Sequence, residues 1–141
     1  MTTTAPVRTP SREVTEELAA QLVDAGGYTH PLFHPDEPAE RPLPGQAVLL
    51  LMGGLVEQSG ALDHAVAMLE IRQARFKAMV RPGHRLHVEL TSAAPEPVKP
   101  GLARQEVTWT AYADDDEVVA TVDVLMLVKA PLEVSGEEGE E

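Results

Sequence analysis

Two histidines and a tyrosine lie close together in the segment Tyr28-Thr29-His30-Pro31-Leu32-Phe33-His34. An imidazole, with a reference pKa of about 6.5, can both accept and donate a proton, so His30 and His34 are candidate general acid/base groups. A phenol has a reference pKa of about 10, and Tyr28 is therefore suited to donate a hydrogen bond or a proton. The alternative is that both histidines only hydrogen-bond to the backbone of a proline-rich loop.

Metal binding is a second interpretation of this segment. His30, His34, Asp36 and Glu37 offer nitrogen and oxygen ligands within a short stretch. The prolines that follow each histidine exclude the helical four-residue spacing that would aim both imidazoles at one ion. We therefore expect no metal site and no cofactor.

The most apolar stretch of the chain lies between Pro44 and Gly60. Residues 47–56 carry no charged or hydrogen-bonding side chain, which predicts a helix covered nearly all round by other elements. Ten apolar residues are too few to span a bilayer, which needs about 20. Gly60 is expected to end the helix in a left-handed conformation.

A pair of glycines, Gly53-Gly54, interrupts this helix. Each glycine costs about 1 kcal/mol of helix propensity relative to alanine. Such a cost suggests that another backbone or a ligand comes close at this point, and close packing against the sheet is the interpretation we favour.

Helix and loop signals precede the apolar helix. Thr15 is expected to cap a helix with Glu16 and Glu17 in its first turn, and Gly26-Gly27 is expected to end it. Five prolines between residues 31 and 44 then exclude regular structure and predict a long loop.

Strand signals follow the apolar helix. Strands are expected over 67–80, 86–91, 106–111 and 118–128, with turns at Arg81-Pro82-Gly83 and Asp114-Asp115-Asp116. Residues 118–128 are apolar at almost every position, which is typical of a central strand buried on both faces. Residues 92–101 are proline-rich and are expected to form a flexible connection.

The order of these elements predicts an α+β protein in which one antiparallel sheet wraps around the central apolar helix. We expect a single domain over residues 11–130. Residues 1–10 are expected to be disordered, and residues 131–141 are expected to form a disordered acidic tail.

Composition narrows the class of function. The chain has 141 residues, 43% of them hydrophobic, and a formal net charge of -12. This charge argues against nucleic acid and anionic membranes as partners. The chain has no cysteine and no secretion signal at its start, so we expect a cytoplasmic protein without disulfides.

Charged residues on the predicted strands have two interpretations each. Asp123 either faces water or is buried with a partner such as Arg72 or Arg75. The basic residues Arg72, Arg75, Lys77 and Arg81 either form a solvated face or bind the phosphates of a coenzyme A or carrier-protein arm.

Three segments in order resemble the MaoC-like branch of the hot dog fold. They are residues 28–34, then Pro44-Gly45-Gln46 opening an apolar helix, then the segment Val80-Arg81-Pro82-Gly83-His84-Arg85-Leu86 opening a strand. The resemblance covers residues 14–128. It implies an antiparallel sheet around one helix, a homodimer or higher oligomer, and substrates that are acyl thioesters of coenzyme A or acyl carrier protein.

The resemblance also bears on the site. In the family's hydratases the loop reads Asp-x-Asn-Pro-x-His, whose aspartate and histidine form the acid/base pair, whereas Tyr28 and Phe33 occupy those two positions here. His34 follows directly and would restore an imidazole if the loop shifted by one residue. The free N–H groups of Gly45 and Gln46 at the helix start match the family and suit a thioester oxygen that gains negative charge.

These inferences predict a hydro-lyase that dehydrates a 3-hydroxyacyl thioester or hydrates the 2-enoyl form. His34 or His30 would carry the proton, and Tyr28 would orient the water or the hydroxyl group. The alternatives are a thioesterase, a hot dog protein that binds an acyl ligand without converting it, and a structural subunit that pairs with an active homologue.

Overall fold

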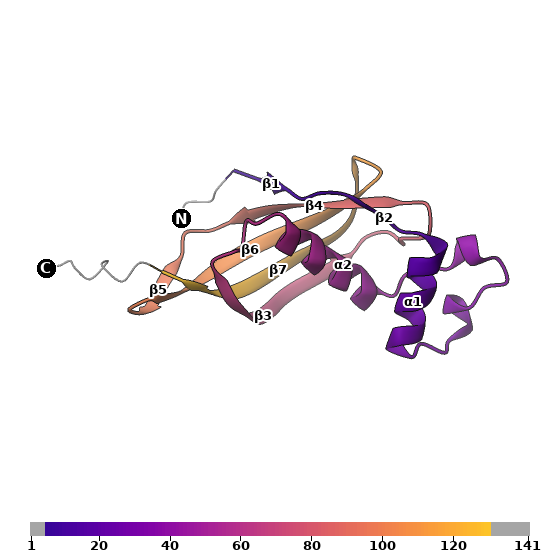
Figure 1. Ribbon diagram of the computed structural model, residues 1–141, viewed down its shortest axis with the longest axis horizontal. Helices are drawn as coiled ribbons and strands as arrows, with labels where there is room; N and C mark the ends of the chain where they lie inside the picture. The colour runs from indigo at the N-terminus through magenta and orange to yellow at the C-terminus, as the bar shows by residue number, and fades with distance from the viewer. Residues whose placement is uncertain (1–4, 131–141) are drawn as a thin grey trace, which may run out of the picture.

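A long antiparallel sheet curls around one helix, as expected for a hot dog fold (Figure 1). The computed structural model describes residues 5–130, so the predicted acidic tail lies outside the described residues. The elements in chain order are β1 (Val7–Arg8), β2 (Arg12–Glu13), α1 (Glu16–Gly26), the 3-10 turns η1 (Pro31–Phe33) and η2 (Pro38–Glu40), α2 (Gly45–Gln58), β3 (Ala65–Phe76), β4 (Arg85–Ser92), β5 (Glu96–Lys99), β6 (Leu102–Ala113) and β7 (Glu117–Lys129).

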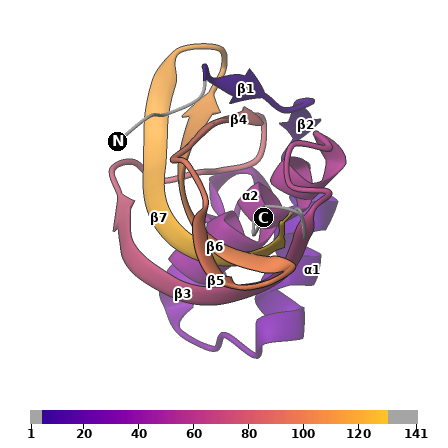
Figure 2. The same ribbon diagram turned by 90° about the vertical axis from the view of Figure 1, so that its left-hand side faces the viewer.

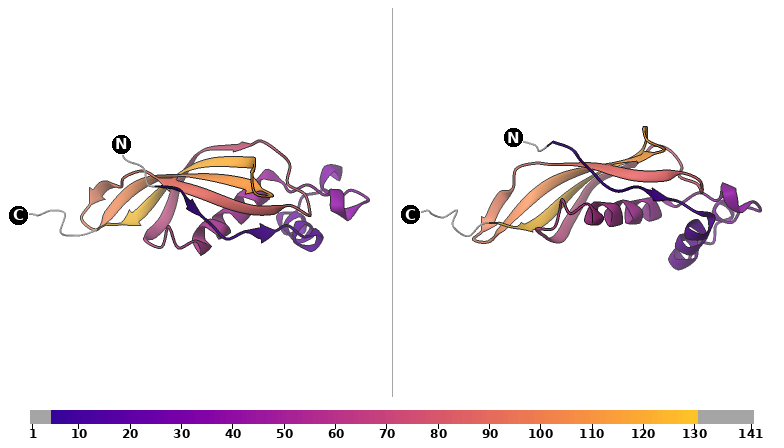
Figure 3. Two further views of the ribbon diagram at one scale, coloured as in Figure 1. Left: turned by 90° about the horizontal axis from the view of Figure 1, so that it is seen from above. Right: turned by 45° about the horizontal axis from the view of Figure 1, so that its top comes forward.

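The strands form one sheet in the order β1-β4-β6-β7-β3, with β2 also paired to β4 and β5 to β6. The end-on view in Figure 2 shows this sheet bending around α2. Figure 3 shows α2 lying along one face of the sheet, while α1 and the two 3-10 turns extend beyond it. The predicted α+β class and the wrapped helix are therefore confirmed.

The core lies between α2 and the concave face of the sheet. Alternate residues of β6 point at the helix, which is the period-two pattern of a strand with one buried face. The buried residues of α2 are Ala47, Val48, Leu51, Met52, Leu55 and Val56. Leu50 and Gly54 are exposed, so the expectation that the helix is covered nearly all round is wrong on this outer side. No helix of the described residues is long and apolar enough to cross a membrane.

The helix and turn signals read from the sequence are confirmed at their ends. The Leu18 N–H donates to Thr15 Oγ1 at 3.0 Å, and Gly27 caps the other end of α1 with a left-handed φ of 74°. Gly60 follows α2 with a φ of 77°. The β6–β7 hairpin turns at Asp114 and Asp115, both of which have positive φ.

Two segments expected to be irregular pair with the sheet. Val7–Arg8 of the predicted disordered segment forms β1 and bonds to β4, with the Thr9 N–H donating to the Val88 carbonyl at 2.9 Å. Glu96–Lys99 of the predicted flexible connection forms β5 against β6. Both strands are too short to show a period of two in the sequence. They form because a neighbouring strand is there to pair with them.

Strand β3 is the open edge of the sheet beside β7. Its register against β7 shifts three times, and each shift leaves one residue of β3 without an opposite residue: Val66, Leu69 and Arg72. Extra residues of this kind bend and twist a strand, which explains how the edge follows the curve around α2. Every residue of β3 after Ala65 is exposed in the single chain.

Candidate functional site

The start of α2 presents two free backbone N–H groups. The first hydrogen bonds of the helix run from the Ala47 and Val48 N–H groups to the Pro44 carbonyl, at 2.9 and 3.1 Å. The N–H groups of Gly45 and Gln46 therefore lie outside the hydrogen bonds of the helix. They sit at the positive end of the helix dipole, where developing negative charge is stabilised.

A cavity of about 360 Å³ opens beside this helix start. Its walls are Leu32 and Phe33 of the preceding loop, residues 42–45 and Val48 of the helix entry, and residues 76–80 at and after the end of β3. A Cβ placed on Gly45 would stand only 3.2 Å from the Phe76 ring, so glycine lets this ring lie against the helix end. Apart from Lys77, the cavity is therefore lined by apolar residues, and it lies at the electropositive end of α2.

Tyr28 reaches the start of α2 from the other end of the loop. Its hydroxyl donates a hydrogen bond to Gln46 Oε1 at 3.1 Å. Its ring meets the Phe33 ring edge-on, with centroids 5.2 Å apart. Gly26 makes room for Tyr28, because a Cβ on Gly26 would lie 2.5 Å from the tyrosine ring. Of the three side chains predicted to act in the site, Tyr28 is the one with a hydrogen bond to α2.

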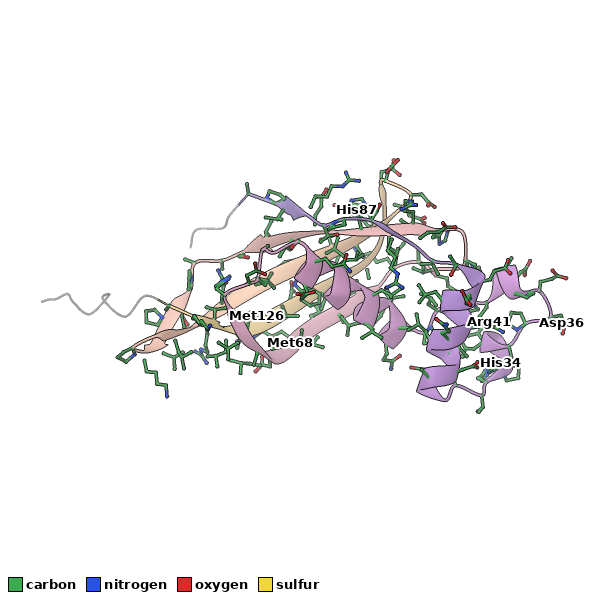
Figure 4. The ribbon with its side chains drawn as sticks, in the orientation of Figure 1. His34, Asp36, Arg41, Met68, His87 and Met126 are labelled. Atoms are coloured by element: carbon green, nitrogen blue, oxygen red, sulfur yellow. The ribbon has the colours of Figure 1, made fainter. Side chains whose placement is uncertain are left out.

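The two histidines bond to the loop backbone. His34 Nε2 lies 2.6 Å from the Tyr28 carbonyl oxygen, and because a carbonyl only accepts, this nitrogen must carry the proton. His30 Nδ1 accepts the Leu32 N–H at 3.0 Å and caps the turn η1. These bonds use one nitrogen of each ring and leave His34 Nδ1 and His30 Nε2 unused by them. Figure 4 shows His34 beyond α1, near Arg41 and away from the sheet.

Of the two neighbouring residues Phe33 and His34, it is Phe33 that lines the cavity. Phe33 lines the cavity together with Gly45, and His30 and His34 do not. The loop thus brings Tyr28 to the helix start, whereas both imidazoles bond to loop backbone groups and are not part of the cavity lining.

A second cavity, of about 410 Å³, lies near the other end of α2. Gly53 and Val56 of the helix, Met68 of β3, Trp109 of β6 and Met126 of β7 are among its walls. Met68 and Met126 are opposite each other in the β3–β7 pair, and Figure 4 shows both far from His34.

The glycine pair of α2 is less crowded than expected. The nearest atom to a Cβ on Gly53 is in the Trp109 ring at 4.0 Å, and a Cβ on Gly54 would meet nothing within 4 Å. Close packing against the sheet, the interpretation favoured from the sequence, is therefore wrong. Gly53 instead borders an open apolar cavity.

The charged strand residues separate into different environments. Asp123 is half-buried on the face away from α2 and accepts a hydrogen bond from Thr108 Oγ1 at 2.9 Å, instead of pairing with an arginine. Arg72 forms ion pairs with Glu70 and Glu106, at 2.9 and 2.7 Å. Within residues 5–130, no group of three or more histidine, cysteine, aspartate or glutamate residues is placed to hold a metal ion.

Sequence reasoning missed several cavity residues and one buried histidine. Phe76 at the end of β3 and Met79 after it line the first cavity, and Trp109 lines the second. No motif marks these residues. The weak signal for Phe76 and Met79 is that two large apolar side chains flank Lys77 just before the turn at residues 81–83. His87 is fully buried, stacks on Tyr112 at 5.1 Å, and has no hydrogen-bond partner for Nε2 among the described residues.

Comparisons with known proteins place the fold. No family model and no curated protein sequence matches the chain. Solved structures do match over nearly the whole chain. The structure of a monoamine oxidase regulatory protein from Archaeoglobus fulgius has a TM-score of 0.77 and 16% identity, and covers 92% of this chain and 91% of its own.

Two further matches carry activities in their descriptions. The MaoC-like dehydratase from Rhodospirillum rubrum has a TM-score of 0.72 and 23% identity, and covers 91% of this chain and 93% of its own. The (R)-hydratase from A. caviae involved in PHA biosynthesis has a TM-score of 0.67 and 17% identity, and covers 89% of this chain and 96% of its own. At these identities the likeness shows the fold, which is the hot dog fold expected from the sequence.

Proposed function

We propose that this protein is an acyl-thioester dehydratase or enoyl hydratase, acting in the cytoplasm on a coenzyme A or carrier-protein thioester. The observation that carries the proposal is the largely apolar cavity lined by Gly45 at the start of α2, a helix whose first two N–H groups lie outside its own hydrogen bonds. The likeness in fold to the R. rubrum MaoC-like dehydratase and the A. caviae (R)-hydratase supports it.

The reaction adds water across the double bond of a 2-enoyl thioester, or removes it in reverse. In hydration the water oxygen bonds to C3 and a proton is delivered to C2; in dehydration the C2 proton leaves and the C3 hydroxyl departs as water. Both directions place negative charge on the thioester oxygen as the C2 proton moves. The N–H groups of Gly45 and Gln46 are the proposed donors to that oxygen.

Tyr28 is the proposed orienting group for the water or hydroxyl. Its hydroxyl is fixed by the hydrogen bond to Gln46 Oε1, one residue into the helix whose N–H groups bind the oxygen. His34 is the first candidate proton carrier, because its ring is anchored to the Tyr28 carbonyl and Nδ1 is not used in that bond. His30 is the second candidate, through Nε2.

The acyl chain is proposed to run along α2 from the first cavity toward the second. Both cavities are bordered by α2 on one side and by β3 or the residues after it on the other. Gly53 leaves the second cavity open, and Met68, Trp109 and Met126 give it an apolar lining.

The protein is proposed to act as a homodimer joined at β3. This edge strand exposes Val66, Met68, Leu69 and Ile71 together with its free backbone groups, which is a surface that proteins normally cover. Both cavities have walls formed by β3 or by the residues directly after it, so a partner at this edge would lie beside both cavities.

Steady-state hydration of a short 2-enoyl-CoA tests the activity and the residues together. We expect turnover by the wild type and a loss of roughly 10²-fold or more in kcat for whichever histidine carries the proton, compared as His34→Ala and His30→Ala. Full activity in both variants would remove the histidines from the mechanism. Release of free thiol from the same substrate would point to thioester hydrolysis instead.

A second candidate function is acyl-ligand binding without conversion. Phe33 lines the cavity where the related hydratase motif has a histidine, and both nearby histidines are bonded to backbone groups. Calorimetry with an acyl-CoA that is bound but not hydrated, dehydrated or hydrolysed would favour this function.

A further inference from the structure

Three cations line the cavity at the start of α2 or contact residues that line it. Lys77 is one of its lining residues. The Arg81 guanidinium lies on the sulfur of Met79, another lining residue, with Nη2 3.5 Å from Sδ. Arg41 donates from Nε to the carbonyl of Phe33 at 3.0 Å. Two of these cations, Lys77 and Arg81, have exposed side chains and reach the rim of the cavity from the segment after β3.

In the part of the chain that the structure describes, these cations form no ion pair with a carboxylate, although carboxylates are abundant. The chain has 23 aspartate and glutamate residues against 11 lysine and arginine residues. Among residues 5–130, the ion pairs of lysine and arginine side chains involve Arg8, Arg72 and Arg104, and none involves the three cations at this cavity. Positive charge is therefore left uncompensated at one cavity of an otherwise acidic protein.

The other basic residues of this region are turned elsewhere. Arg72 is held by two glutamates. Arg75 precedes Phe76 on β3, and because neighbouring residues of a strand point to opposite faces, it lies on the face away from this cavity. There its guanidinium donates to the Gln73 side-chain oxygen at 2.8 Å in the amide orientation that satisfies both groups. Of the four basic residues noted in the sequence, Lys77 and Arg81 remain at the cavity.

We propose that Lys77 and Arg81 bind the phosphate groups of a coenzyme A thioester and so determine which thioester the protein accepts. This inference rests on the proposed function, because it concerns the coenzyme A part of the same thioester substrate. Phosphate oxygens accept charge-assisted hydrogen bonds from ammonium and guanidinium groups, whereas the acyl end of the substrate offers no such charge. The exposed side chains of Phe76 and Met79, which line the same cavity, provide apolar contact for the uncharged part of coenzyme A.

The arrangement fits a free small molecule better than a thioester carried on an acidic protein. Two cations at one rim can hold a compact phosphate ester at short range. Coenzyme A is also an anion, but it is small enough to be held by a few cations, whereas an acidic partner protein would bring a whole surface of like charge against a chain with net charge -12. The inferred substrate is therefore the coenzyme A ester and not the carrier-protein ester.

The test compares one acyl group on two handles. A 2-enoyl-CoA and the same enoyl group on N-acetylcysteamine, which has no phosphate, are assayed with the wild type, Lys77→Ala, Arg81→Ala and the control Arg75→Ala. We expect KM for the coenzyme A ester to rise about tenfold in each of the first two variants, with KM for the N-acetylcysteamine ester and kcat unchanged. Arg75→Ala should match the wild type on both substrates. Circular dichroism checks that all variants fold.

Several outcomes would overturn the inference. An equal rise in KM for both esters in Lys77→Ala would show that the Lys77 side chain does not bind the phosphates. A loss of activity in these variants that is confined to an acyl carrier protein substrate would show that the cations bind the carrier protein instead. If the wild type turns over neither ester, the proposed reaction fails, and calorimetry with coenzyme A then tests the phosphate site alone. Weaker binding by Lys77→Ala and Arg81→Ala than by the wild type would support the phosphate site. Unchanged or absent binding would reject the phosphate site as well.

Discussion

The Tyr28 hydroxyl donates to Gln46 Oε1 at 3.1 Å and so connects the loop to the start of the central helix. Gly26 controls this contact, because any side chain there would occupy the space of the Tyr28 ring. We predict that Gly26→Ala displaces Tyr28 and lowers hydration activity by the same factor as Tyr28→Phe. The measurement is kcat/KM of the two single variants and of the double variant.

The double variant separates displacement from other effects of the alanine. If Gly26→Ala acts through Tyr28, adding Tyr28→Phe to it should cost nothing further, so the two losses will not add. Additive losses would show that the alanine acts elsewhere in α1. Gly54→Ala serves as the control, because a Cβ at Gly54 meets no atom within 4 Å.

The glycine pair in α2 predicts a gain of stability. Gly54 is helical, exposed and free of neighbours, so Gly54→Ala should raise the free energy of unfolding by about 0.5–1 kcal/mol through helix propensity alone. Urea denaturation measures the change. A decrease would indicate that another chain approaches this glycine in the assembled protein.

The neighbouring glycine predicts a change in substrate range instead. Gly53 borders the second cavity, and Gly53→Val would fill part of its volume, with the valine Cβ 4.0 Å from the nearest atom, in the Trp109 ring. We expect kcat/KM for long 2-enoyl-CoA substrates to fall by tenfold or more, with short substrates affected less than threefold. The chain-length profile of Gly54→Ala should match the wild type. Equal losses at every chain length would place the acyl group outside this cavity.

Local signals in the sequence were sufficient to predict the helices and the main turns. Thr15 caps α1, Gly27 and Gly60 adopt left-handed conformations, and Asp114 opens a tight hairpin, because these features depend on a few neighbouring residues. The wrapped helix was also predictable, since residues 47–56 require cover on most sides.

The direction of side chains in the loop was not predictable. Whether Phe33 or His34 lines the cavity depends on the backbone of η1, which His30 fixes by accepting the Leu32 N–H. The alternation of β3 was equally hidden, because its three register shifts move residues between faces. Such features depend on tertiary pairing, and a linear pattern does not carry them.

The exposed edge of β3 predicts the oligomeric state. Leu69 and Ile71 are 47% and 45% exposed, and a partner strand there would bury both side chains. We predict that the double variant Leu69→Lys and Ile71→Lys shifts the protein from dimer to monomer, because it introduces four like charges into one two-fold interface. Sedimentation velocity measures the change.

Val98 offers a matched control for this experiment. It is 53% exposed on β5, which pairs with β6 and not with the β3 edge. Val98→Lys should leave the sedimentation coefficient unchanged. A wild type that sediments as a monomer, or a double variant that remains dimeric, would contradict an interface at β3.

The buried His87 predicts how stability depends on pH. Burial lowers the pKa of His87 below the reference value of 6.5, and the nearby Arg8 guanidinium lowers it further, while Glu89 and Asp115 raise it in part. The unfolded chain therefore binds a proton near pH 6.5 that the folded protein does not bind. The stabilising contribution is fully present above pH 6.5 and is lost as pH falls from there toward the lower pKa of the folded state.

A substitution that keeps the packing isolates this contribution. His87 is 2% exposed and stacks on Tyr112, and phenylalanine retains the stacked ring while removing the unpartnered Nε2. Urea unfolding from pH 8 to pH 5 should show a loss of stability in the wild type that is smaller in His87→Phe, with a difference in slope of at most about 1.4 kcal/mol per pH unit. His64→Gln, which removes a different partly buried imidazole, controls for the loss of any histidine. Parallel curves for the wild type and His87→Phe would mean that His87 takes up its proton equally in the folded and unfolded states.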